Sequence, residues 1–263
     1  MKDFIEFSEL TLDKNFNMTE PHNHDCYEFY FLLDGEREFF MTDKIINVGK
    51  NSLIIIPPFV LHKTEGGPYR RVNINISEKY LTKYEKNVVD GIIEKVLVQL
   101  DEKHLPTIQH LLHEGAKIDA SDDPNAIEFM TDFFHGIVKL LGLSDLKSAD
   151  ETRVLQISDG TDTILKVVNY LNQHYTQKLN LKEIADAFYL SKTALCTSFN
   201  KVMNCSVMKY VTKLRITAAQ KLLDDSDKSV EEIAEICGFS SASYFGLAFK
   251  NEKGKSPIHY RKR

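Results

Sequence analysis

Residues 181–191 read L-K-E-I-A-D-A-F-Y-L-S, and residues 230–240 read V-E-E-I-A-E-I-C-G-F-S. The two segments share Glu, Ile, Ala and Ser at an offset of 49 residues, which becomes 50 further on, where Phe199 and Tyr210 match Phe249 and Tyr260. Two copies are too few for a solenoid, whose repeats must stack to bury a continuous core. The pattern therefore predicts one duplicated supersecondary unit.

Each copy has the pattern of a short helix, a tight turn and a second helix. Apolar residues at i, i+3, i+4 and i+7 within 181–188 predict a helix that buries one face. Tyr189 and Gly238 occupy the turns, where a positive φ favours glycine. Ser191 and Ser240 are expected to be the N-caps of the second helices, because a serine hydroxyl accepts the first unpaired backbone N–H groups.

A single long helix, expected from about Ser206 to Leu223, joins the two copies. At 1.5 Å per residue it would be roughly 27 Å long. Such a helix would hold the two second helices near the ~34 Å that separates successive major-groove faces of DNA. This arrangement predicts a DNA-binding domain with two helix-turn-helix units.

The C-terminal region resembles the DNA-binding domain of the AraC/XylS family of bacterial transcription regulators. The resemblance covers about residues 161–263 and is carried by K-E-I-A at 182–185, F-N-K-V-M-N-C-S-V-M-K-Y-V-T-K-L-R-I-T-A-A at 199–219 and G-F-S-S-A-S-Y-F-G-L-A-F-K-N-E-K-G-K-S-P-I-H-Y-R at 238–261. It implies a sequence-specific transcription regulator, expected to be an activator and not an enzyme. Its implied partners are double-stranded DNA and RNA polymerase.

By this resemblance, the second helices and the chain end present twelve side chains to DNA: Lys192, Thr193, Cys196, Thr197, Asn200, Lys201, Ser241, Ala242, Ser243, Leu247, Lys250 and Arg261. Many family members carry arginine where Thr197 and Leu247 stand. The bidentate arginine–guanine contact is therefore missing, and small or apolar side chains favour thymine methyl groups. The sequence predicts an A·T-rich operator, read either by contact or by DNA shape.

Charge divides the chain in the same place. Residues 161–263 hold 16 Lys and Arg against 10 Asp and Glu, whereas residues 1–160 hold 17 against 28, so the net charge of −5 combines a basic and an acidic part. A basic domain fits a polyanionic partner. The four cysteines form no C-x-x-C pair, and the most apolar run, at 53–61, is interrupted by two prolines. We therefore expect a cytoplasmic protein with no membrane partner.

Residues 1–77 read as short strands with no helix between them, which predicts a small β-barrel or jelly roll. Two motifs in this region resemble those of cupins: His22-x-His24-x3-Glu28-x6-Gly35, and then Gly49, Pro57 and His62. The second motif departs from the usual pattern, because Pro58-Phe59 replaces Pro-x-Gly and the preceding spacing is longer. AraC-type regulators commonly carry a cupin-like N-terminal domain, so the two resemblances agree.

The resemblance implies a small-molecule effector in the barrel, in contact with His22, His24, Glu28, Tyr30 and His62. A sugar is one candidate effector, since barrel mouths are common ligand pockets. The three histidines and the glutamate of this set are also ligands that a divalent metal accepts. Because such regulators often keep the pattern without metal, we expect neither a metal nor another cofactor.

Residues 78–143 become helical, with helices predicted at 79–89, 105–118 and 124–142 and one more strand at 92–100. The last helix carries two apolar stripes, so one can pack on its own domain while the other meets a partner. The stripe assigned to a homodimer interface consists of Ile127, Met130, Phe134, Ile137 and Leu141. Burial of the helix on all sides within its own domain is the alternative.

The expected fold is α+β with two domains: a cupin-like effector and dimerisation domain at 1–143, a polar linker at 144–162 and an AraC-type DNA-binding domain at 163–263. Two other functions stay open. A metal-dependent cupin enzyme fused to a nucleic-acid-binding module would require a tightly bound metal, and a regulator without effector would respond to its own abundance. No catalytic triad, P-loop or dinucleotide fingerprint supports another class of enzyme.

Overall fold

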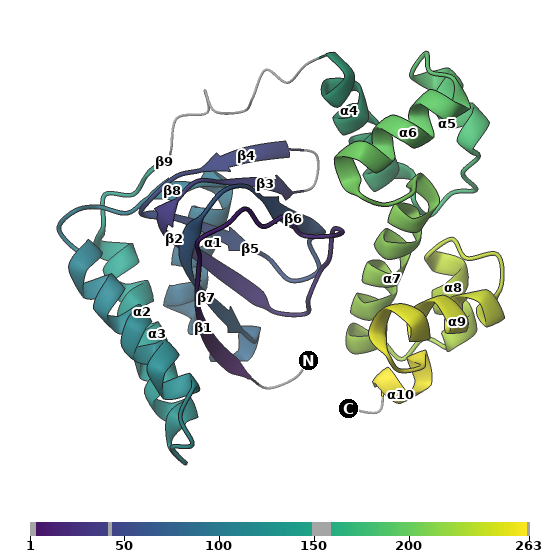
Figure 1. Cartoon of the computed structure of the whole chain (residues 1–263). Coiled ribbons are helices and arrows are strands. Elements are labelled where there is room, and N and C mark those ends of the chain that lie inside the picture. The colour runs from purple at the N-terminus through teal and green to yellow at the C-terminus, as the bar shows by residue number, and fades with distance from the viewer. Residues whose placement is uncertain (1–3, 42–43, 149–158, 262–263) are drawn as a thin grey trace.

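A computed structural model describes residues 4–41, 44–148 and 159–261. It contains an N-terminal domain of sheets and helices beside an all-helical C-terminal domain (Figure 1). This confirms the predicted two-domain α+β architecture. No helix among the described residues is long and apolar enough to cross a membrane.

The N-terminal strands form two sheets, one of six strands in the order β1-β7-β2-β5-β8-β9 and one of three in the order β4-β3-β6. Their bounds are β1 Ile5–Leu12, β2 Tyr27–Gly35, β3 Arg37–Met41, β4 Lys44–Val48, β5 Ser52–Ile56, β6 His62–Glu65, β7 Tyr69–Ile76, β8 Val98–Gln99 and β9 Lys147–Ser148. The sheets face each other across a volume that we call the intersheet space, where the rings of Tyr30 and Phe39 meet at 4.6 Å. The described strands do not join into one closed sheet.

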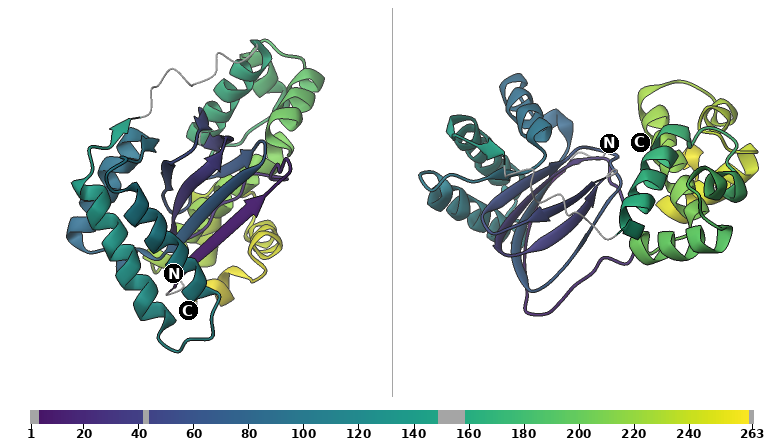
Figure 2. Two further views of the ribbon diagram at one scale, coloured as in Figure 1. Left: turned by 60° about the vertical axis from the view of Figure 1, so that its left-hand side comes forward. Right: turned by 90° about the horizontal axis from the view of Figure 1, so that it is seen from above.

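Helices cover the opposite face of the six-stranded sheet, as Figure 2 shows. After a 3-10 turn at Glu78–Tyr80, they are α1 Lys83–Lys95, α2 Leu105–Asp119 and α3 Ala126–Leu143. Side chains alternate along a strand, so β2 directs Phe29 toward these helices and Tyr30 into the intersheet space. Phe29 meets Phe134 of α3 edge-on at 5.2 Å.

The prediction of a strand at 92–100 is wrong for most of these residues. Residues 92–95 are the end of α1, and only Val98 and Gln99 pair as a strand. Thr82 and Glu85 form a capping box at the start of α1. Such a cap satisfies two backbone donors and fixes the start of the helix at Lys83. Ile92 therefore reaches the core from a helix and not from a strand.

The predicted dimer stripe needs correction. Four of its five side chains are buried in the chain's own core: Met130, Phe134, Ile137 and Leu141. Ile127 is the exception, with 55% of its surface exposed. Both stripes of α3 are apolar in sequence, and it is this stripe that packs against the six-stranded sheet. These four side chains are therefore not available to a partner chain.

The C-terminal domain consists of α4 Asp159–His174, α5 Leu181–Ala187, α6 Lys192–Met203, α7 Val207–Asp225, α8 Val230–Ile236, α9 Ala242–Lys253 and α10 Pro257–Arg261. It has two cores, one around α4–α6 and one around α8–α10, and α7 contributes to both. The helix predicted from Thr163 begins at Asp159. Most of the predicted linker, at 149–158, lies outside the described residues.

Two glycines of the second helix-turn-helix unit should respond oppositely to alanine. Gly238 has φ +80°, and a Cβ there would lie 2.2 Å from the carbonyl oxygen of Thr176. We expect Gly238→Ala to lower the free energy of unfolding by at least about 2 kcal/mol, through backbone strain and this clash. Gly246 lies within α9 with nothing within 4 Å of a Cβ, so Gly246→Ala should raise it by up to about 1 kcal/mol. Urea unfolding of both variants measures the difference, and equal effects would contradict this description of the turn.

Candidate functional site

The turns of the two helix-turn-helix units have the predicted left-handed geometry. Tyr189 has φ 56° and Gly238 has φ 80°. Ser191 caps α6, since its hydroxyl accepts the N–H three residues further on at 3.1 Å. In the second unit the cap is Ser241, at 3.2 Å, and the prediction of Ser240 is wrong. The second turn contains one extra residue, which moves the start of α9 by one position.

The spacing of the second helices is set by α7. This helix has 19 residues, which corresponds to about 28 Å. The helix-turn-helix units lie toward its two ends (Figure 1), where Val207 and Val211 pack in the first core and Ile216 and Leu223 in the second. The length agrees with the predicted spacer and is close to one turn of B-DNA.

Most of the side chains predicted to read DNA lie on exposed surfaces of α6 and α9. Nine of the twelve are exposed: Lys192, Thr193, Thr197, Asn200, Lys201, Ser241, Ser243, Leu247 and Lys250. Cys196 and Ala242 are half-buried. Arg261 differs, because its Nε and Nη2 atoms are buried. Two of its three guanidinium nitrogens are therefore not available to a phosphate.

Sequence reasoning missed one prominent side chain at this surface. Tyr189 is 98% exposed at the turn that precedes α6. The sequence indicated only that its backbone conformation would be strained. A left-handed residue without a packing partner directs its side chain outward, and that combination is a signal for a surface contact. Tyr189 is thus a further candidate for a contact to the DNA backbone.

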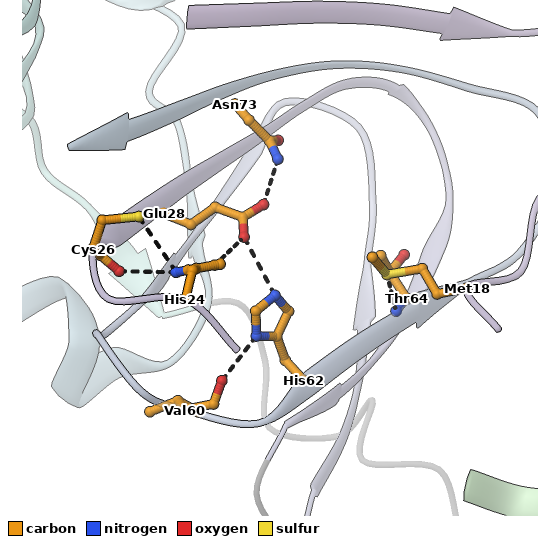
Figure 3. Close-up of polar contacts among 8 residues, drawn as sticks. All are labelled: Met18, His24, Cys26, Glu28, Val60, His62, Thr64 and Asn73. Atoms are coloured by element: carbon orange, nitrogen blue, oxygen red, sulfur yellow. Dashed lines mark hydrogen bonds and ion pairs between the residues drawn. The ribbon is translucent and has the colours of Figure 1, made fainter. Parts of the chain in front are cut away.

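In the N-terminal domain, the predicted pocket residues converge at one end of the intersheet space. One ligand atom from each of His22, His24, Glu28 and His62 lies within 4.8 Å of the others. Figure 3 shows His24 and His62 pointing toward the carboxylate of Glu28, with Nε2–Oε2 distances of 2.8 and 3.3 Å. Tyr30 is also buried in the intersheet space, one position further along the same face of β2.

Backbone carbonyls orient both of these imidazoles. Nδ1 of His24 lies 3.0 Å from the carbonyl oxygen of Cys26, and Nδ1 of His62 lies 3.0 Å from that of Val60. A carbonyl oxygen only accepts, so each Nδ1 carries a proton and each Nε2 is directed at Glu28. A carboxylate also only accepts, so each Nε2 must present either a second proton or a bound cation to it.

This donor set fits a divalent metal ion. Three imidazole nitrogens and one carboxylate suit several transition metals, and carbonyls that fix Nδ1–H are the usual outer partners of ligating histidines. Asn73 donates a hydrogen bond to the other oxygen of Glu28. Without a metal, the same geometry is a network of charged hydrogen bonds that can accept a polar ligand.

The charges within the cluster follow from these contacts. Burial alone would raise the pKa of Glu28, but hydrogen bonds from His24 and His62 hold it well below its ordinary value. Burial opposes charge on His24 as well, yet its hydrogen bonds to Cys26 and Glu28 raise its pKa to about 10. Burial and the charge of His62 lower the pKa of His22 to about 4. At neutral pH, His24 and Glu28 form an ion pair and His22 is neutral.

Residues next to the cluster contact the DNA-binding domain. Asn23, between His22 and His24 in sequence, receives a hydrogen bond from Nζ of Lys253 at 2.9 Å and donates one to Thr217 of α7. Leu61, next to His62, packs in the core of the first helix-turn-helix unit. The two domains therefore meet directly beside the pocket.

Two buried lysines complete this interface. The side chain of Lys63 is fully buried, and its Nζ donates to the carbonyl oxygen of Val202 at 2.6 Å and to Glu65 at 2.5 Å. Nζ of Lys213 in α7 donates to the carbonyl oxygen of Pro21 at 2.7 Å. Because a buried ammonium is costly without such partners, these contacts hold the domains in a defined arrangement.

The chain has relatives among transcription regulators. A family model described as a helix-turn-helix domain matches residues 184–263. The uncharacterized HTH-type transcriptional regulator YdeC of Bacillus subtilis is 23% identical over 97% of this chain and 90% of its own length. The HTH-type transcriptional activator RhaS of Escherichia fergusonii is 27% identical over 62% of this chain and 56% of its own length, so the match spans little more than half of RhaS. The solved DNA-binding domain of AdpA, in complex with a target DNA, is 28% identical over 38% of this chain and 90% of that one, with a TM-score of 0.37.

Two exposed reading helices held by one spacer helix define a DNA-binding protein of the helix-turn-helix class. The family match over residues 184–263 and the regulators aligned with the chain specify the class further. Residues 184–263 therefore form a helix-turn-helix domain of the AraC type, and the chain is similar to a transcription regulator over most of its length.

Because of the ion pair between His24 and Glu28, the stability of the fold should decrease as the pH becomes alkaline. Its folded-state pKa of about 10 lies above the ordinary value of 6.5, so its stabilisation is complete below pH 6.5 and is lost as the pH rises toward 10. We expect the melting temperature of the native chain to fall across this window by at least about 2 °C more than that of His24→Gln. His113→Gln, which removes a half-exposed histidine paired with Glu9, is the control and should keep the native slope. If the melting temperature of His24→Gln fell with pH as steeply as that of the native chain, the raised pKa assigned to His24 would be contradicted.

Proposed function

We propose that this protein is a homodimeric transcription activator whose affinity for DNA is controlled by a small molecule bound in a cupin-like N-terminal domain. The observation that carries the DNA-binding role is the pair of exposed helices, α6 and α9, at the two ends of α7. Lysines at 192, 201 and 250 are exposed on these helices and suit phosphate contacts. Contact with RNA polymerase follows from the proposed activator role.

The pocket supports the effector role because it lies beside the domain interface. His22, His24 and His62 are each within one residue of a side chain that contacts the C-terminal domain. A ligand that moves these segments would change contacts with α7, which carries both reading helices. Such a ligand shifts the equilibrium between domain arrangements only by its difference in affinity for them.

Base preference follows from the small and apolar side chains on the reading helices. We expect selection from random DNA to give an A·T-rich consensus, because Thr197 and Leu247 lack the bidentate donors that recognise guanine. Thr197→Arg should introduce a G·C pair at one position, with a preference of about 1–3 kcal/mol. As a control, Lys192→Ala should weaken binding to all sequences alike. It should also reduce the slope of log affinity against log salt concentration by about 1. A G·C-rich consensus for the native chain would refute this reading.

Domain coupling can be measured without knowing the effector. Lys63 and Lys213 are almost completely buried at the domain interface, so Lys63→Met with Lys213→Met should remove the polar contacts of these two lysines at a cost of about 2–6 kcal/mol in total. We expect the native chain to unfold in one calorimetric transition and the double variant in two. Lys86→Met, at an exposed pair with Glu78, should cost less than about 1 kcal/mol and keep one transition. A single transition in the double variant would place the coupling elsewhere.

The proposed dimer uses the outer surface of α3 rather than its buried stripe. Ile127 and Phe129 are 55% and 42% exposed there, and single exposed apolar residues are common on any surface. We expect Ile127→Glu with Phe129→Glu to give a folded monomer by light scattering, because both side chains lie outside the core. The pair Ile236→Glu with Ile258→Glu, on exposed residues of the C-terminal domain, should remain dimeric. A dimeric Ile127/Phe129 variant would move the interface to another surface.

A metal-dependent function is the second candidate, and the orientation of His24 and His62 favours it. Both Nε2 atoms and a carboxylate are arranged as a metal ion would require. Elemental analysis of the purified protein distinguishes the two candidates. One transition-metal ion per chain, lost in His62→Ala, would support the metal site, whereas a metal-free protein that still binds its operator would leave an organic effector. A regulator that works without an effector would bind neither a metal ion nor an organic effector.

A further inference from the structure

The intersheet space contains a concentration of buried polar atoms without hydrogen-bond partners. Nine such side-chain atoms occur among the described residues, and five of them belong to this space: Tyr30 Oη, Arg37 Nη2, Arg71 Nη1, Asn73 Oδ1 and Asn75 Oδ1. Native proteins leave few buried polar groups unpaired, because each costs its desolvation free energy. A ligand bound in this interior would supply partners to several of these atoms at once.

Strand register orders these groups along the space. Asn75 lies opposite Glu28 of β2, and Arg71 lies opposite Leu32. Four residues separate these two layers, which is about 13 Å at 3.3 Å per residue. The histidine–glutamate cluster therefore occupies one end of the intersheet space and Arg71 the other, with Tyr30 between them.

A second guanidinium reaches the Arg71 end from the opposite sheet. Arg37 of β3 is 2% exposed, and its guanidinium carbon lies 4.4 Å from the ring centroid of Tyr69. Its Nε donates to Oγ1 of Thr64 at 2.9 Å and its Nη1 to the carbonyl oxygen of Gly67 at 3.4 Å. These contacts fix the side chain and leave Nη2 directed into the protein without an acceptor.

Neither arginine has an acidic partner among the residues that the structure describes. Arg71 lies 5.6 Å from the ring centroid of Tyr30 and donates no hydrogen bond to any of them. Glu28 is already paired with His24 and His62. Two guanidinium groups that share an interior without a carboxylate repel each other and lose hydration, and a bound anion would remove both costs.

A cavity lies beside Arg37. This cavity of about 420 Å³ is lined by Glu36, Arg37, Glu38, Asn47, Val48, Gly66 and Gly67. Its size admits a small organic molecule. The two glutamates disfavour a ligand with several negative charges, whereas a single carboxylate can pair with the arginines. Asn73 and Asn75 offer acceptor oxygens, which require hydroxyl donors on the ligand.

We infer that Arg37 and Arg71 bind the carboxylate of a small hydroxy acid, whose hydroxyl groups pair with Tyr30 and Asn73. The inference rests on the proposed effector site and names the chemical class of its ligand. A neutral sugar accepts hydrogen bonds from guanidinium groups but leaves their charges uncompensated, so the structure favours an acid over a sugar. Arg37 Nη2 and Arg71 Nη1 would each donate to a carboxylate oxygen, and charge-assisted hydrogen bonds of this kind supply the selectivity.

The test uses the full chain and matched acid and neutral probes. The 15Nε signals of Arg37 and Arg71, assigned with single Arg→Lys variants, are followed by NMR during titration with formate, lactate and gluconate. Propane-1,2-diol and glucitol are the neutral counterparts of the latter two. We expect the acids to shift both signals saturably below about 100 mM, and the neutral compounds to leave them unchanged.

Two neighbouring arginines provide the matched variants. Arg71→Gln should weaken binding of the acids at least about tenfold. Arg70→Gln, at an exposed residue paired with Glu9, should change it less than about twofold. If Arg71→Gln fails to fold, Arg71→Lys should still lose affinity, because it keeps the charge without the planar donors.

The inference is overturned if no acid, formate included, gives a saturable shift, if acids and neutral compounds act alike, or if Arg70→Gln weakens binding as much as Arg71→Gln. Operator binding is measured separately by bandshift on the same preparations. Specific DNA binding without acid binding would reject the ligand class alone. Acid binding without specific DNA binding would reject the proposed regulator and leave the anion site.

Discussion

The packing of α7 is the constraint on which the rest of the molecule depends. Ten of its 19 residues are buried, because its first half closes the core of one helix-turn-helix unit and its second half closes the other. Arg215 ties it further to the segment before α5, with hydrogen bonds of 2.7 and 2.8 Å to the carbonyl oxygens of Tyr175 and Gln177. The helix also faces the N-terminal domain through Lys213 and Thr217. A shift of α7 therefore moves α6 and α9 with it.

The N-terminal domain connects to this spacer helix through its most polar region. Glu28 anchors His24 and His62 at one end of the intersheet space, and the residues next to these histidines reach the C-terminal domain. Buried charged groups are weak evidence for stability but require a defined arrangement, because breaking any one pair leaves a charge uncompensated. A ligand that changes this network would thus act on contacts that the DNA-binding domain needs.

The sequence predicted the C-terminal domain better than the N-terminal one. Repetition of Glu-Ile-Ala and of a later phenylalanine and tyrosine specified both helix-turn-helix units, because each copy must bury the same face. The cap at Ser241 was missed, since a one-residue insertion in a turn leaves the apolar pattern unchanged. The burial of Phe134 was also missed, because two equally apolar stripes on α3 do not indicate which one meets the sheet. The resemblance to the cupin motifs predicted the convergence of His22, His24, Glu28 and His62. The placement of Arg37 and Arg71 on two facing sheets has no local signal in the sequence.

The most direct test of this account concerns α7 as a rigid spacer. Affinity is measured by fluorescence anisotropy for a selected operator and for the same operator with about five base pairs, half a helical turn, inserted between the segments contacted by α6 and α9. If α7 fixes the spacing, the insertion turns one contacted segment to the opposite side of the duplex, and affinity should fall at least about 100-fold, toward non-specific binding. Equal affinity for both duplexes would contradict the account, because it would show that the two helices do not read DNA as one rigid unit.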